Sequence, residues 1–224
     1  MAQRIMTPDR AEQRLTMTYE EYLAWADEDT HAEWVDGEVI VFIPPVIRHQ
    51  RLVVFLTTLL ELYSRMRDLG EVLVAPTEMR LAMVRSAREP DILFVSHEHR
   101  DRVAERRIDG PADLVIEVVS EDIVSRDRRD KLLEYQRAGV PEYWIVDARE
   151  GRQAFEPFTL TDRGVFQLIT PDGDGRIHLI VLPELWIDPA WLWQDPLPSP
   201  LRVLRRIVPD LLSELRAEAE SDET

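Results

Sequence analysis

Cysteine is absent from this 224-residue chain, and that absence removes two classes of structure. Without cysteine there are no disulfides to hold a small domain together, and no thiolates to build a zinc or iron–sulfur centre. Any metal site must therefore use oxygen or imidazole ligands. Because nothing in this composition indicates an oxidising compartment, we expect a cytoplasmic protein.

Long apolar runs are also missing. The longest uncharged apolar stretch extends from Leu52 to Leu60, far short of the ~20 residues that a membrane-spanning helix requires. We therefore expect no membrane association. With 45% hydrophobic residues, the chain can still bury one sizeable core.

A net positive charge is the third feature that the chain lacks. Acidic residues outnumber basic ones by 43 to 27, which gives a formal net charge of −16. This balance argues against a general polyanion binder, because phosphate contacts draw their affinity from lysine and arginine. Part of the excess lies in Glu214–Glu223, which we expect to be a solvated tail. Two local groups of arginines are candidates for lining a substrate groove: Arg100, Arg102, Arg106 and Arg107, and Arg126, Arg128 and Arg129.

Lysine is nearly absent, since 26 of the 27 basic residues are arginines and the remaining one is Lys131. Unlike arginine, lysine is a compact charge whose pKa responds to burial and to neighbouring charges. The surrounding pattern predicts a helix over Val124–Ala138 that ends at Gly139. At ~100° per residue, Lys131 shares an apolar face with Leu132 and Tyr135. A buried ammonium needs a carboxylate partner, so we expect one nearby.

Two carboxylates lie inside apolar stretches that are typical of buried strands. Asp91 is in the stretch Pro90–Val95, and Glu117 is in the stretch Asp113–Val119. One interpretation is a buried ion pair with an arginine. The other is a pair of oxygen ligands for a divalent cation, with Lys131 beside them, because Mg²⁺ prefers carboxylate and carbonyl oxygens.

The order of these residues resembles a known family. Asp91 after a proline, Glu117 near the end of a strand and Lys131 on the following helix are similar to the PD-(D/E)XK motif of restriction-endonuclease-like nucleases. The run from Asp130 to Asp147 resembles more narrowly the Uma-two family of endonucleases. Two further segments and one residue match that family's pattern: Met17–Tyr22, Glu33–Glu38 and His49. With them the resemblance extends over roughly residues 15 to 193.

The resemblance implies metal-dependent hydrolysis of phosphodiester bonds, with DNA as the expected substrate. It implies that the ligands of Mg²⁺ or Mn²⁺ are Asp91, Glu117 and the Val118 backbone carbonyl. It implies that Lys131 orients water or stabilises the transition state, and that Glu33 and His49 are accessory residues. One position departs from the motif, because the usual lysine two residues after the strand acid is replaced by Val119. Catalysis then depends on Lys131 reaching the site from its helix.

Two alternatives remain open at this point. The chain could be a non-catalytic binding or regulatory protein that keeps the nuclease fold, which the missing strand lysine and the acidic surface both favour. In a third, purely structural interpretation, Asp91, Glu117 and Lys131 form a buried ionic cluster. Resemblance in fold does not choose among these functions. A homodimer or a higher homo-oligomer is a candidate assembly.

The periodicity predicts an α+β protein with a restriction-endonuclease-like core, a mixed sheet flanked by helices. Thr18–Glu21 resembles a capping box before a short helix. Asp36-Gly37 is a strong hairpin signal within Glu33–Phe42, and a long helix is predicted over about Val46–Asp68. Strands are expected at Val72–Ala75, Glu78–Met83, Asp91–Val95, Asp113–Val119 and Tyr143–Val146.

The chain after Asp147 has a different pattern, in which short strand-like segments alternate with Gly and Asp. Segments near Gln153–Leu160, Val165–Ile169 and Arg176–Val181 predict a β-rich extension. A final helix is expected near Pro209–Glu218. We therefore expect a flexible N-terminal segment over residues 1–15, a single nuclease-like domain over 16–200 with the β extension from about 150, and a C-terminal helix with an acidic tail over 201–224.

Overall fold

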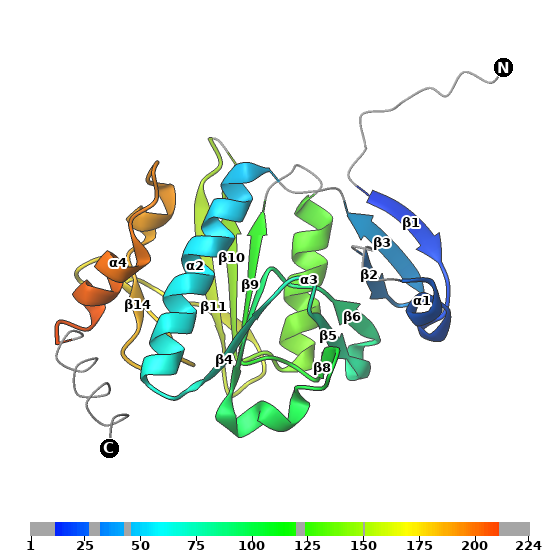
Figure 1. The fold of residues 1–224 in the computed structure, drawn as a ribbon. Helices are drawn as coiled ribbons and strands as arrows, with labels where there is room; N and C mark the ends of the chain where they lie inside the picture. Colours follow the sequence, from blue (N-terminus) through cyan, green and yellow to red (C-terminus); the bar gives the residue numbers. More distant parts are fainter. Residues whose placement is uncertain (1–11, 27–31, 43–45, 120–123, 150, 211–224) are drawn as a thin grey trace.

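The computed structural model describes residues 12–26, 32–42, 46–119, 124–149 and 151–210. It has the mixed α/β architecture expected from the sequence, with two long helices against a central sheet and a second sheet to one side (Figure 1). Of the helices in these ranges, none has both the length and the apolar character that crossing a membrane demands.

The central sheet has six strands in the order β12-β11-β10-β9-β7-β4. β9 and β10 are parallel, and the other neighbouring pairs are antiparallel. Helix α3 (Val124–Ala138) is the crossover between the two parallel strands, as predicted. The strands are β4 (Gly70–Val74), β7 (Ile92–Ser96), β9 (Leu114–Val119), β10 (Glu142–Asp147), β11 (Ala154–Leu160) and β12 (Phe166–Leu168).

Alternation along β9 decides what each face of the central sheet carries. Ile116 and Val118 join the core beneath helix α2 (Ile47–Met66), whereas Val115 joins the core on the α3 side. Because side chains alternate along a strand, Glu117 points to the same side as Val115. This alternation brings the carboxylate of Glu117 against α3.

The second sheet has the order β1-β3-β2-β6-β5-β8 and supplies residues to the same region. Its hairpin turns at Asp36 (φ 48°) and Gly37 (φ 93°), and two consecutive positive φ angles are what a tight hairpin turn requires. Helix α1 (Tyr19–Trp25) begins with the expected capping box at Thr18 and Glu21. The strands are β1 (Glu12–Thr16), β2 (Ala32–Val35), β3 (Glu38–Phe42), β5 (Glu78–Leu81), β6 (Ser86–Arg88) and β8 (Arg107–Asp109).

Two expectations about the fold are corrected. The strands form two large sheets rather than one, because β2 pairs with β6 and β6 with β5, apart from the central ladder. Residues 12–15 belong to β1, which pairs with β3, so they are not part of a flexible segment. The β-rich extension after Asp147 is present as expected, and its strands β11 and β12 extend the central sheet through β10.

The C-terminal part closes the α2 side of the central sheet. Trp191 and Leu192 in the short helix η3 (Pro189–Trp193) belong to the core beneath α2, and so do two residues of α4 (Pro200–Ile207). The remaining elements are η1 (Ala82–Val84), η2 (His97–Arg102), β13 (Ile177–His178) and β14 (Trp186–Ile187). The helix predicted near Pro209–Glu218 and the acidic tail fall almost entirely beyond residue 210, outside the described residues.

Candidate active site

The candidate site lies where two strands of the central sheet stop pairing. The antiparallel ladder between β7 and β9 ends at the pair Ile92 and Ile116, although β9 continues to Val119. Asp91 immediately precedes β7, and its Oδ2 accepts a hydrogen bond from the Val118 backbone N–H at 2.7 Å. The carboxylate therefore takes the place of the missing strand partner.

His49 holds the other oxygen of Asp91. It is 5% exposed in the first turns of α2, and its Nε2 lies 3.0 Å from Asp91 Oδ1. Within the described residues, its Nδ1 is buried and has no hydrogen-bond partner. The hydrogen that contacts Asp91 is therefore assigned to Nε2, because a hydrogen on Nδ1 would be a buried donor without an acceptor.

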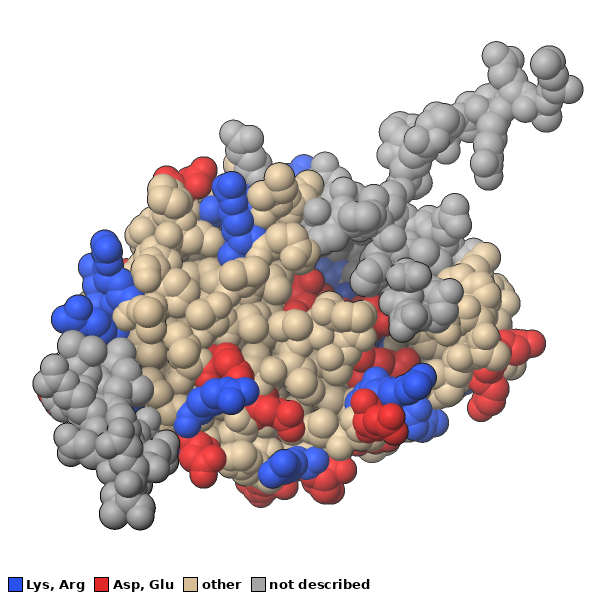
Figure 2. Space-filling model, in the orientation of Figure 1, with Lys and Arg blue, Asp and Glu red and all other residues tan. Residues whose placement is uncertain are grey.

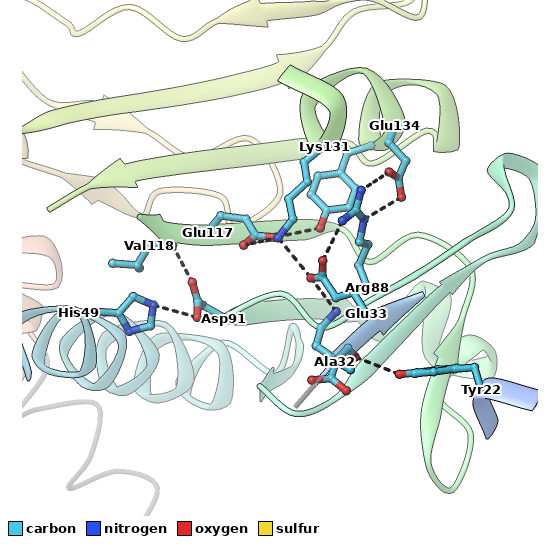
Figure 3. Close-up of polar contacts among 12 residues, drawn as sticks. Tyr22, Ala32, Glu33, His49, Arg88, Asp91, Glu117, Val118, Lys131 and Glu134 are labelled. Carbon is cyan, nitrogen blue, oxygen red and sulfur yellow. Dashed lines mark hydrogen bonds and ion pairs between the residues drawn. The ribbon is translucent and has the colours of Figure 1, made fainter. Parts of the chain in front are cut away.

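Lys131 projects from α3 into a buried position between two carboxylates. It is 7% exposed, and its Nζ lies 3.1 Å from both oxygens of Glu117 and 3.2 Å from Glu33 Oε1 (Figure 3). The Tyr135 hydroxyl, one helical turn further along α3, donates to Glu117 Oε1 at 2.8 Å. The expectation that Lys131 faces the core and meets a carboxylate is confirmed. Glu33, from the second sheet, is the other carboxylate in contact with it.

The two carboxylates beside Lys131, Glu117 and Glu33, have pKa values shifted in opposite directions. Burial, with the Asp91 and Glu33 charges adding to it, raises the pKa of Glu117 to about 7 despite the opposing effect of Lys131. Burial also acts on Glu33, but Lys131 and Arg88 outweigh it and lower the pKa of Glu33 below its usual value. Glu33 is therefore the permanent anion of the pair.

Glu89 is a fourth carboxylate in this region. Burial raises the pKa of Glu89 to about 8, and the charges of Glu33 and Glu78 add to the shift. Its backbone N–H donates to Glu33 Oε1 at 3.2 Å. The region thus gathers more negative charge than its cationic side chains offset, which favours a bound cation.

Replacing Glu89 by Gln should remove part of the pH dependence of stability. A carboxyl group whose pKa is raised by folding stabilises the native state below about pH 4.5, and this contribution is lost as the pH rises toward 8. At pH 8.5, Glu89→Gln should raise the metal-free free energy of unfolding by about 1–3 kcal/mol, allowing for partial exposure, with little change at pH 4.5. Urea unfolding at both pH values measures this, with the exposed Glu98→Gln as control. Parallel pH profiles for Glu89→Gln and wild type would contradict it.

The residues present fit a hard divalent cation with oxygen ligands. In a strand, the N–H and C=O of one residue point to the same side, and the Val118 N–H points to Asp91. The neighbouring Val119 carbonyl accepts instead from Ala148, just beyond β10. The Val118 carbonyl therefore faces the side of Asp91, where it could bind a cation together with Asp91 and Glu117. No three His, Asp or Glu side chains of the described ranges form a ready metal cage, so the backbone oxygen is needed as the third ligand.

Two residues of the cluster have no signal in the sequence motif. Arg88, in β6, is 2% exposed and donates to Glu33 Oε2 at 2.7 Å. Its Nε and Nη2 donate to the two oxygens of Glu134 at 3.1 and 2.7 Å. Helical spacing could have identified Glu134, three residues after Lys131. Nothing local to β6 indicates that Arg88 faces this site, because its partners come from β2 and α3.

The charged surface around the site does not form a continuous basic groove. In Figure 2, blue and red side chains are interspersed along the lower edge of the molecule, and the centre of this face is largely uncharged. Three of the arginines considered for a substrate groove bind within the protein: Arg102 to the Pro111 carbonyl, Arg107 to Asp109, and Arg128 to Asp147 and Glu156. The side chain of Arg126 lies outside the described residues.

Comparisons with known proteins give the family of the chain and a structure with a similar fold. A family model described as "Uma2: Putative restriction endonuclease" matches residues 19–190. A crystal structure of a "putative nuclease belonging to DUF820" from Anabaena variabilis has a similar fold, with a TM-score of 0.59 at 15% sequence identity, covering 79% of this chain and 97% of that one. None of the curated proteins compared matches. The chain therefore belongs to the Uma2 family.

Proposed function

We propose that this chain is a divalent-cation-dependent endonuclease that hydrolyses phosphodiester bonds in DNA. The observation that carries the proposal is the position of Lys131, whose buried Nζ lies 3.1 Å from Glu117 in β9. The next residue of β9, Val118, donates its backbone N–H to Asp91. The family description supports the reaction class. Metal-assisted hydrolysis needs oxygen ligands for the cation, and a lysine beside one of those ligands, Glu117, can stabilise charge on the substrate.

Asp91, Glu117 and the Val118 carbonyl would hold Mg²⁺ or Mn²⁺. When bound there, the cation supplies Lewis-acid polarisation of the phosphate and lowers the pKa of water in its coordination shell. His49 keeps one Asp91 oxygen in place at 3.0 Å, which fixes the carboxylate in the orientation that faces the end of β9. Tyr135 does the same for Glu117 through its hydroxyl.

Lys131 would act on the substrate from its position beside Glu117. Its ammonium donates to the attacking water or to a phosphoryl oxygen, where the contact strengthens as negative charge develops in the transition state. Glu33 keeps the ammonium charged and directed toward Glu117. Lys131 thereby takes the role of the lysine that position 119 of β9 lacks.

The second candidate function is a binding or regulatory protein without turnover. The observation that favours it is that the oxygens of Asp91 and Glu117 already accept hydrogen bonds from His49, Val118, Lys131 and Tyr135. A cation must displace or share some of these contacts. The net charge of −16 adds a penalty for approach to DNA.

The main proposal also includes a cytoplasmic location and a homo-oligomer, which would bring two sites to the two strands of a duplex.

A metal titration followed by a cleavage assay tests the proposal. Wild type should bind Mn²⁺ or Mg²⁺ in calorimetry and nick supercoiled plasmid at low salt, and chelation by EDTA should stop nicking. Glu117→Gln should lose both properties. Glu142→Gln, in which a buried carboxyl on the neighbouring strand binds Trp144 and Ile180, should keep both. Metal binding without nicking would favour the binding protein, and no metal binding would favour a structural ion cluster.

A further inference from the structure

Arg88, in β6, connects the second sheet to α3 through a set of hydrogen bonds. Its guanidinium contacts Glu134 with two parallel bonds, at 3.1 and 2.7 Å, and Glu33 with a third at 2.7 Å. Paired N–H donors that meet both oxygens of a carboxylate fix the plane of the guanidinium. Because the group is 2% exposed, water does not compete for these contacts.

The two oxygens of Glu33 have separate partners, and this division is what matters for Lys131. Oε2 accepts from Arg88, whereas Oε1 accepts from Lys131 and from the Glu89 backbone N–H, each at 3.2 Å. Arg88 therefore directs Oε1 at the ammonium. Figure 3 shows Glu33 between the Arg88 guanidinium and the Lys131 ammonium, with Glu117 on the far side of Lys131.

Among the described residues, loss of the Arg88 contact would leave Lys131 as the cationic side chain that contacts the buried Glu33. The ammonium would then be drawn toward Glu33, or Glu33 would take up a proton and release the ammonium toward Glu117. In either case the distance between Lys131 and Glu117 would change. The position of Lys131 beside Glu117 thus depends on Arg88, although none of these hydrogen bonds joins Arg88 to Lys131.

We propose that Arg88 is a positioning residue that acts through Glu33 to hold the Lys131 ammonium opposite Glu117. Its importance for cleavage rests on the proposed endonuclease function. Its effect on the geometry of Lys131 does not, since that follows from the hydrogen bonds alone. The two parts can therefore be tested separately.

The first experiment observes Lys131 directly, which its status as the sole lysine permits. Protein labelled with ¹³C-lysine gives one side-chain Cε resonance, from Lys131. Arg88→Gln, which adds no second lysine, should shift this resonance away from its wild-type position in the metal-free protein. Glu142→Gln, which disturbs a buried carboxyl elsewhere in the central sheet, should leave it unchanged. A Cε resonance that stays at its wild-type position in a folded Arg88→Gln protein would overturn the proposal.

A milder variant covers the case in which Arg88→Gln does not fold. Glu134 borders an open cavity of about 430 Å³ between α3 and the β2–β3 hairpin, so a Gln side chain has room there. Glu134→Gln keeps an acceptor but weakens the anchor of the guanidinium. It should shift the Lys131 resonance in the same direction as Arg88→Gln, by a smaller amount. No shift in a folded Glu134→Gln protein would count against the proposal.

The second experiment measures Mn²⁺-dependent plasmid nicking by the same variants. Arg88→Gln should lower kcat by about 10–100-fold and Glu134→Gln by about 3–10-fold, with KM nearly unchanged, because neither side chain is assigned a substrate contact. A normal kcat in both, together with an unmoved resonance, removes the positioning role while the endonuclease proposal stands. Absence of nicking by wild type removes the endonuclease proposal, and the resonance shift still decides whether Arg88 positions Lys131.

Discussion

Asp91→Asn should abolish cation-dependent cleavage of DNA and leave the metal-free fold intact. The amide can still accept the Val118 N–H bond at the position of Oδ2, and it removes a charge that repels Glu117. It cannot provide an anionic ligand. We expect nicking of supercoiled plasmid to fall by at least about 100-fold, as is typical when an electrostatic contributor to the transition state is lost. The metal-free free energy of unfolding should fall by no more than about 1–2 kcal/mol, because the amide NH2 then faces His49 Nε2 and the ring must take its other tautomer, a cost that the lost repulsion of Glu117 partly offsets.

The chain contains a closely matched control for this substitution. Asp113 precedes β9 as Asp91 precedes β7; its Oδ2 accepts from the Ser96 N–H at 2.8 Å and its Oδ1 lies 2.7 Å from His99 Nδ1. It therefore has the same pair of contacts at the opposite end of the same antiparallel strands. Asp113→Asn should keep metal binding and nicking. If both variants lose activity equally, or if Asp91→Asn costs several kcal/mol of metal-free stability, the carboxylate is structural.

Lys131→Arg should remain folded yet lose most of its cleavage activity. Nζ lies 3.2 Å from Glu33 and 3.1 Å from Glu117, a gap that accommodates one compact ammonium. A guanidinium can pair with both carboxylates and preserve the charge, but its planar fork places its donors at other points. The expected loss of Mn²⁺-supported nicking is on the order of 100-fold.

The assay for Lys131→Arg compares plasmid conversion at low salt, where screening does not weaken capture of DNA by local arginines. Arg137→Lys, on the cavity side of the same helix, controls for a general disturbance of α3. Equal activity of Lys131→Arg and wild type would show that position 131 needs only a positive charge. No activity in either protein, despite bound metal, would favour the non-catalytic binding protein.

Local patterns in the sequence were sufficient to predict most elements of the fold. The capping box at Thr18, the positive φ angles at Asp36-Gly37 and the glycine that ends α3 each act within a few residues, so a short window contains the relevant physics. The apolar periodicity of α2 is likewise local, and it predicted a helix over about Val46–Asp68, close to the observed Ile47–Met66. The pairing of β2 with β6 is set by residues about fifty positions apart, which no short window contains.

The sequence by itself determined that Lys131 faces the core and needs an acid, because helical periodicity and the cost of an unpaired buried charge are properties of the chain. It also identified Asp91 and Glu117 through their order in a family motif. Only the tertiary structure decided which groups meet Lys131. Glu33 reaches it from the second sheet, Arg88 fixes Glu33 from an adjacent strand, and the early end of the β7–β9 ladder exposes the Val118 N–H to Asp91. These contacts join segments far apart in sequence, and their geometry follows from how the sheets and α3 pack, which the sequence pattern does not encode locally.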